Sequence, residues 1–311
     1  MPWRRGVLAA VVVADLVTIF RGFDDARKVS FAEGAAFGWF VDLLSRPPAA
    51  AIVLFAGIAG AVAFARRPGR LWEGGLALGA LILSNTAHTQ LLGTPSRNFF
   101  YSGACLSGWM LGLAAARRRG APEDESYALT GAVALLGAVY LNAGLSKLVF
   151  GGIGWVRGVS LQSLIIGLDN ADPGFLGALH ARILGSPAAI FFFSTAAVGL
   201  ELSGPLMLAG PRVRRFVAFG LLVMHASIFL LTRIGYWEAL VFLLAFVVFA
   251  GEPSPDAARR GSPPNRRAFL QTAGLLAACA VFAVFRQGYR SRHYQGRGPG
   301  ESRGAASPAK P

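Results

Sequence analysis

The stretch YALTGAVALLGAVYLNAGLSKLV, residues 127–149, decides the fold class of this chain. It is apolar almost throughout and carries a single charged residue, Lys147, close to its end. About 20 mostly apolar residues are enough to cross the hydrocarbon core of a bilayer as a helix. We therefore interpret the stretch as a membrane helix, and its lysine is the feature that needs an explanation.

The same character extends over the whole chain of 311 residues, which is 54% hydrophobic and 15% charged, with a mean hydropathy of +0.51. Soluble domains carry about 25% charged residues, so the composition predicts a polytopic membrane protein. The net charge of +14 lies mostly in short arginine clusters between apolar runs. That placement is typical of topology signals and gives no case for a nucleic-acid partner. Cys105 and Cys279 lie in apolar runs without CxxC spacing, which favours buried small residues over a disulfide or a metal site.

Nine segments approach the length and apolarity of a membrane helix, which predicts an all-α bundle of about nine membrane helices. The last two segments are short and the least certain in length. The nine segments are residues 6–23, 48–66, 71–92, 99–116, 127–149, 188–209, 213–232, 236–250 and 268–285.

The basic loops alternate along the chain in step with these segments. Clusters of arginine precede the first segment and follow the second, fourth, sixth and eighth, whereas the other short loops carry isolated arginines. Because basic loops stay in the cytoplasm, we expect a multi-pass protein of the cell inner membrane, with a cytoplasmic amino terminus and an outer carboxyl terminus. The clusters also give the chain a means of contacting anionic membrane lipids.

The regions between and after the segments have compositions of their own. We interpret residues 24–47 as an interfacial amphipathic helix, residues 251–267 as a cytoplasmic linker and residues 286–311 as a disordered basic tail. The stretch that begins NRRAFL at Asn265 resembles a twin-arginine export signal. It is equally an arginine pair placed before the last membrane helix, and we favour this second interpretation.

Ionisable groups inside the bilayer are costly, at roughly 2.5–3.5 kcal/mol each for lysine, arginine or aspartate on insertion scales. Each has a structural explanation, such as a lysine that extends to the headgroups or a histidine that bonds a carbonyl. Lys147, Glu201 and His225 lie in neighbouring segments, and we expect them to share a cavity open to the outer face. The polar residues within the segments are Asp15, Thr86, His88, Gln90, Asn142, Ser146, Lys147, Glu201, His225 and Glu238.

The surroundings of Lys147 are also informative. Asn142 and Ser146 are four residues apart and share one helix face, whereas Lys147 points about 100° away from Ser146. Gly144 allows a second helix to approach closely. Trp155, after a glycine-rich break, is placed as an interfacial anchor.

Three blocks carry a resemblance to a known family. They are AGLSKL at 143–148 with Trp155 and Gly158 behind it, GLELSGPLML at 199–208, and HASIFLLTRIGYWEAL at 225–240. Together they resemble the vitamin K-dependent gamma-carboxylases and the wider horizontally transferred transmembrane (HTTM) domain family. The likeness covers about residues 130–250, and the apolar pattern extends it to a domain of residues 1–250.

The resemblance implies a concrete chemistry. In the carboxylases the lysine of the first block is the base that activates reduced vitamin K, and Lys147 stands at that position, with Glu201 and His225 as further catalytic residues. The implied cofactor is a reduced quinone of the vitamin K or menaquinone type, a lipid-soluble small molecule, and no metal. Asn142, Ser146, Trp155 and His88 are the residues we assign to its binding.

The chain departs from the carboxylases in three respects. Ser146 replaces the first lysine of the family's pair, RNFFY at 97–101 replaces a stretch that carries a functional histidine, and we find no counterpart of the large luminal region. These departures count against carboxylation of protein glutamates more than against deprotonation or oxygenation of a quinol. A non-enzymatic carrier or partner subunit and a DoxX-like quinone-linked subunit remain as alternatives.

Overall fold

The computed structural model describes residues 2–26, 43–44, 46–67, 70–92, 99–120, 125–167, 175–232 and 235–249. In this part of the chain every regular element is a helix, which confirms the predicted all-α class. The long helices are α1 (Pro2–Ala26), α3 (Pro47–Arg66), α4 (Leu71–Leu92), α5 (Phe99–Arg118), α6 (Glu125–Gly151), α10 (Pro187–Leu202) and α11 (Pro211–Thr232). The short ones are α7 (Ile153–Val156), α8 (Val159–Gly167), α9 (Phe175–Leu184), the 3-10 turn η1 (Gly204–Leu208), α12 (Trp237–Phe242) and the π-helical stretch η2 (Leu243–Val248).

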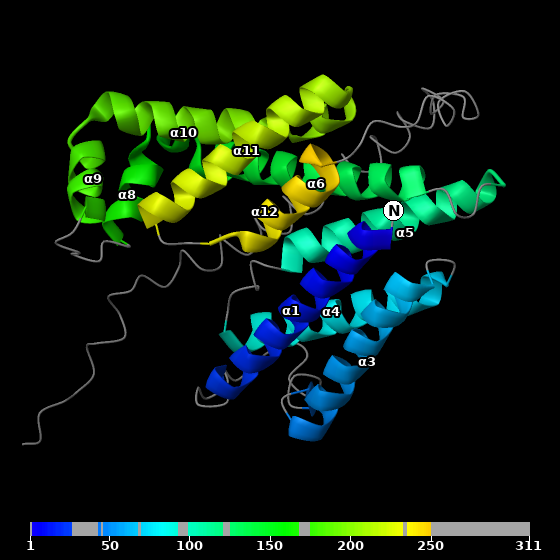
Figure 1. The fold of residues 1–311 in the computed structure, drawn as a ribbon. Coiled ribbons are helices and arrows are strands. Elements are labelled where there is room, and N and C mark those ends of the chain that lie inside the picture. Colours follow the sequence, from blue (N-terminus) through cyan, green and yellow to red (C-terminus); the bar gives the residue numbers. More distant parts are fainter. Residues whose placement is uncertain are drawn as a thin grey trace, which may run out of the picture.

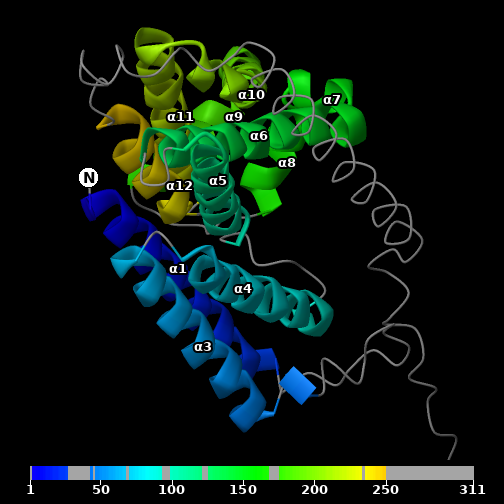
Figure 2. The same cartoon turned by 90° about the vertical axis from the view of Figure 1, so that its right-hand side faces the viewer.

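The helices form two groups that meet at α5. Helices α1, α3 and α4 pack against one another on one side, and α6, α10, α11 and α12 lie on the other (Figures 1 and 2). Helix α5 contacts both groups, and its most extensive contact is with α6. The short helices α8 and α9 lie at one end of the second group (Figure 1), and α7 contacts α6, α8 and α10.

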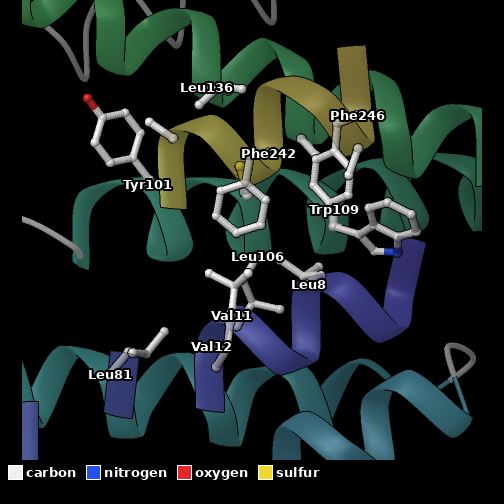
Figure 3. Close-up of a cluster of buried hydrophobic side chains, with 14 of the residues drawn as sticks. Leu8, Val11, Val12, Leu81, Tyr101, Leu106, Trp109, Leu136, Phe242 and Phe246 are labelled. Carbon is white, nitrogen blue, oxygen red and sulfur yellow. The ribbon is translucent and has the colours of Figure 1, made fainter. Parts of the chain in front are cut away.

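The apolar core lies where the two groups meet. Leu8 and Val11 of α1 lie toward Leu106 and Trp109 of α5, and Phe242 of α12 packs into the same cluster (Figure 3). Large apolar side chains also cover the outside of the molecule. Phe216 is 78% exposed, whereas the carboxylate-bearing Glu238 is 0% exposed. A soluble protein would reverse that order, so this distribution suits a bundle whose outer surface faces lipid.

Helices α5 and α6 approach until their backbones touch. A Cβ atom added to Gly108 would lie 2.3 Å from the carbonyl oxygen of Gly131, and one added to Gly112 would lie 2.1 Å from that of Tyr127. Gly108 and Gly112 form a GxxxG motif, whose small residues allow close packing of membrane helices. A larger side chain at any of these positions would push the two helices apart.

Three helices in the described part are long and apolar enough to cross a membrane: Pro47–Arg66, Glu125–Gly151 and Pro211–Leu231. The pair Gly177–Leu184 and Pro187–Leu202, bent by 96°, would add a fourth if it counts as one span. Helices α1, α4 and α5 have 25, 22 and 20 residues but are not among these candidates. The apolar helices therefore support a membrane protein, while the predicted count of nine crossings is not established by them.

The structure corrects one predicted segment. Residues 188–209 are not one continuous helix, because α10 ends at Leu202 and the chain continues as the 3-10 turn η1. The reason is Pro205, which has no N–H to donate and clashes with the preceding helical turn. The last segment, 268–285, lies outside the described residues, as do most of 24–47, the linker 251–267 and the tail 286–311.

Candidate functional site

The centre of the site is an ion pair between Lys147 of α6 and Glu201 of α10. The Lys147 Nζ lies 2.5 Å from Oε1 and 2.6 Å from Oε2 of Glu201, so that the ammonium donates to both carboxylate oxygens. The lysine side chain is 23% exposed and that of the glutamate 8%. The pair is thus largely removed from solvent but is reached from one side, through the lysine.

The two helices can bring these side chains together because Gly144 lies where they cross. A Cβ atom at Gly144 would lie 3.0 Å from the backbone nitrogen of Leu202 and 3.1 Å from the Cβ of Glu201. The absence of a side chain at Gly144 lets the end of α10 rest on α6, three residues before Lys147. The glycine that suggested a close helix approach is therefore the residue that positions the carboxylate.

Trp155 also contacts the side chain of Lys147. The Lys147 Nζ lies 5.2 Å from the centroid of the Trp155 ring, within the range of a cation–π contact. Helix α6 ends at Gly151, and Gly152 follows with a φ of +53°, which turns the chain back. A Cβ atom at Gly151 would collide with the Trp155 ring, so only glycine allows this arrangement. The predicted glycine-rich break and tryptophan thus serve the lysine directly.

His225 of α11 lies in a cluster of aromatic rings. Its Nε2 is 2.8 Å from the hydroxyl oxygen of Tyr140, and its ring centroid is 5.3 Å from that of Tyr236. Tyr101 of α5 completes the cluster, since its ring centroid lies 5.8 Å from that of Tyr140 and 6.2 Å from that of His225. His225 is 3% exposed, and its Nδ1 has no hydrogen-bond partner among the described residues.

The predicted trio is thus brought together in two parts. Lys147 and Glu201 pair directly, whereas the hydrogen bond of His225 goes to Tyr140. The parts are neighbours, because the charge of Lys147 acts on the His225 ring and that of Glu201 acts on the Tyr140 hydroxyl. Tyr140 precedes Lys147 by seven residues, two helical turns, so both lie on one face of α6.

The residues assigned to quinone binding have different outcomes. Trp155 lies at the ion pair. Asn142 and Ser146 lie half-buried on α6, and the buried Oδ1 of Asn142 has no donor in the described part. His88 lies on α4, whose packing partners are α1, α3 and α5, so it belongs to the other group of helices.

Three tyrosines were missed by the sequence analysis. Tyr140 could have been found from its spacing to Lys147, and Tyr236 stands inside the histidine block of the family resemblance. Tyr101 ends the RNFFY stretch that occupies the place of the family's functional histidine. Its ring lies beside His225 in the structure, but nothing in the sequence links these two residues.

The arrangement can exchange protons at a place that is screened from water. It combines a paired ammonium and carboxylate with a histidine–tyrosine hydrogen bond, both groups that can gain or lose a proton. No group of three or more histidine, cysteine, aspartate or glutamate side chains in the described residues is placed to hold a metal ion. Neither the family models, nor the curated proteins, nor the solved structures that we compared with the chain give a match.

Proposed function

We propose that this chain is a multi-pass membrane enzyme of the HTTM type that deprotonates a lipid-soluble quinol at the Lys147–Glu201 pair. The observation that supports the proposal best is the pair itself. The Lys147 ammonium donates to both carboxylate oxygens of Glu201, and its Nζ lies 5.2 Å from the centroid of the Trp155 ring. The lysine lies at the end of a helix that is long and apolar enough to span a bilayer. Ionisable groups placed at this expense inside a membrane usually serve binding or proton transfer.

The location is part of the same proposal. About nine crossings, a cytoplasmic amino terminus and an outer carboxyl terminus in a bacterial inner membrane agree with the alternation of the arginine clusters. Under this topology Lys147 lies near the outer end of α6. A quinol with a long apolar tail would reach it from the lipid, past the exposed side chains of Val149 and Phe150 at the same helix end.

The residues of the pair divide the work between them. Transfer of one proton from the Lys147 ammonium to the Glu201 carboxylate turns the ion pair into a neutral amine and a carboxylic acid. The amine then takes the proton of a quinol hydroxyl and becomes an ammonium again, which holds the resulting oxyanion electrostatically. Glu201 is thus the store for the first proton and Lys147 is the base.

A reduced quinone supplies the oxidisable ring for this chemistry. When dioxygen oxidises it to the epoxide, one oxygen atom enters the ring, and the other leaves as water with the two quinol hydrogens. The Trp155 ring and the half-buried Asn142 and Ser146 are the groups placed to hold the ring. The Asn142 Oδ1, which lacks a donor in the described part, would accept a hydrogen bond from a quinol hydroxyl.

The test is quinone epoxide formation. Purified full-length protein in lipid is given reduced menaquinone or vitamin K with oxygen and bicarbonate, alongside Lys147→Ala and, as a matched control, Arg157→Ala, which removes an exposed cation near the same helix end. We expect epoxide from the wild type and from Arg157→Ala, and its loss in Lys147→Ala. Absence of epoxide from folded wild-type protein would overturn the proposal in favour of a carrier or a partner subunit. Equal product from Lys147→Ala would remove the lysine from the mechanism.

A further inference from the structure

A second polar cluster lies in the core, outside the site described above. It consists of Asp15 of α1, Ser102 of α5 and Glu238 of α12, and all three residues are fully buried. The Ser102 hydroxyl donates a hydrogen bond to Oδ2 of Asp15. The carboxyl groups of Asp15 and Glu238 lie close enough to interact directly.

The carboxylate oxygens of this cluster lack ordinary partners. Oδ1 of Asp15 and both Oε atoms of Glu238 are buried without a hydrogen-bond donor among the described residues. Buried polar atoms are almost always satisfied, so a fully buried glutamate with two unsatisfied oxygens points to something that it binds. Glu238 is the unpartnered group here, and its carboxyl group interacts with that of Asp15.

Arginines near the cluster have partners of their own among the described residues. The Arg4 guanidinium binds the carbonyl oxygen of Phe249, and Arg5 pairs with Glu125 at 2.8 Å. Just before α4, Arg70 pairs with Glu73 at 3.9 Å. Other titratable groups on the helices packed around the cluster include Tyr101 and Cys105 on α5, Tyr236 before α12, His88 on α4 and His225 on α11.

Two adjacent ionised carboxylates at this depth would repel each other and would each lose their hydration. One proton removes both problems, because it joins the two groups in a hydrogen bond and leaves a single negative charge. A bound metal ion is the weaker solution. Calcium takes six to eight oxygen ligands, and this cluster offers two carboxyl groups and a hydroxyl.

We propose that Asp15 and Glu238 share one proton and, with Ser102, form a proton-binding site in the membrane-embedded core. The proton lies between the two carboxyl groups, and the Ser102 hydroxyl holds the Asp15 oxygen that faces away from Glu238. The site stands on residues that the quinol proposal does not use. The Tyr101 ring links the two regions, because it packs against Tyr140 on one helix and against Tyr236, the neighbour of α12.

Infrared spectroscopy of the full-length protein in lipid at neutral pH tests the proposal. A protonated carboxyl group gives a carbonyl band that ionised carboxylates do not have, and deuterium exchange shifts it. We expect such a band in the wild type, its loss in Glu238→Gln and its loss or shift in Asp15→Asn. The Glu125→Gln variant, which changes a carboxylate outside both this cluster and the quinol site, should keep the band.

Three results would overturn the proposal. They are a wild-type spectrum without the band, a band that neither Glu238→Gln nor Asp15→Asn changes, and a band that disappears when sodium is added at constant pH, which would indicate a cation site. Reaction of the buried Cys105 with a thiol reagent, in a Cys279→Ser background, reports whether each variant is folded. If the carboxyl variants unfold, Ser102→Ala replaces them. It removes only one hydrogen bond and should shift the band, and an unshifted band would likewise overturn the proposal.

Discussion

Glu201 and Glu238 are both buried glutamates in one helical bundle, and they are neutralised in different ways. Glu201, 6% exposed, is held by the ammonium of Lys147 from a neighbouring helix. Glu238, 0% exposed, faces another carboxyl group, that of Asp15. The comparison teaches that the same side chain acts as the partner of a charge in one place and, in our proposal, as a proton carrier in the other. The same substitution should therefore have opposite effects at the two positions.

The largest effect is expected for Glu201→Gln. The variant leaves the Lys147 ammonium largely buried without its carboxylate, and breaking such a pair costs about 3 kcal/mol in the free energy of unfolding. Thermal unfolding in detergent, followed by the reaction of Cys105 with a thiol reagent in a Cys279→Ser background, measures the change. An unchanged midpoint would show that the ion pair does not hold α6 and α10 together. The double variant Lys147→Met/Glu201→Leu should recover most of the loss.

Gly144→Leu tests the Lys147–Glu201 ion pair by changing the helix contact that positions it. The added side chain meets the Leu202 backbone and Glu201 Cβ, and overpacking of this kind costs about 1–3 kcal/mol. Separation of α10 from α6 should also release Lys147, so its labelling by an amine reagent should increase when measured by mass spectrometry. Gly199→Leu is the matched control, since Gly199 on α10 has no atom within 4 Å of its added Cβ. Equal labelling of Lys147 in both variants would contradict the role of Gly144.

Tyr140→Phe tests the hydrogen bond between Tyr140 and His225. It removes the partner of His225 Nε2 and leaves a buried ring nitrogen unsatisfied, at a cost of about 1–2 kcal/mol. Tyr127→Phe makes the same change on the same helix, where the hydroxyl bonds Arg119 at an exposed position. Its effect should stay within about 0.5 kcal/mol. If the two variants have equal unfolding midpoints, the histidine–tyrosine bond does not stabilise the core.

Glu238→Gln gives the smallest expected change in stability. The variant removes a negative charge that has no cationic partner and keeps the shape of the side chain, so the free energy of unfolding should rise or stay within about 1 kcal/mol. The measurement is the Cys105 unfolding midpoint used for Glu201→Gln. A loss as large as that of Glu201→Gln would mean that Glu238 is ionised and bound to a cationic group, and the contrast between the two glutamates would fail.

Much of this contrast was visible in the sequence, although its pairing was not. Lys147, Glu201 and His225 stood out because ionisable residues are rare in apolar segments, and Gly144 indicated a close approach on α6. Asp15 and Glu238 were equally visible as polar residues. Their contact depends on how α1 and α12, from opposite ends of the described chain, both pack on α5, and local periodicity carries no information about that. Pro205 indicated the break after Leu202, but the continuous apolarity of residues 188–209 favoured a single helix.

The contact between α5 and α6 sets a mechanical condition on both regions. Tyr101 and Ser102 belong to α5, whereas Tyr140 and Lys147 belong to α6, and the glycine backbones at 108 and 131 interlock between them. Neither helix can slide past the other without forcing those backbones through each other. When the bilayer thickens or thins, the outer helices can change their tilt. The spacing between the Lys147–Glu201 ion pair and the Asp15–Glu238 carboxyl pair stays the same. The distance between the two sites is thus set by the α5–α6 contact and does not depend on the thickness of the surrounding bilayer.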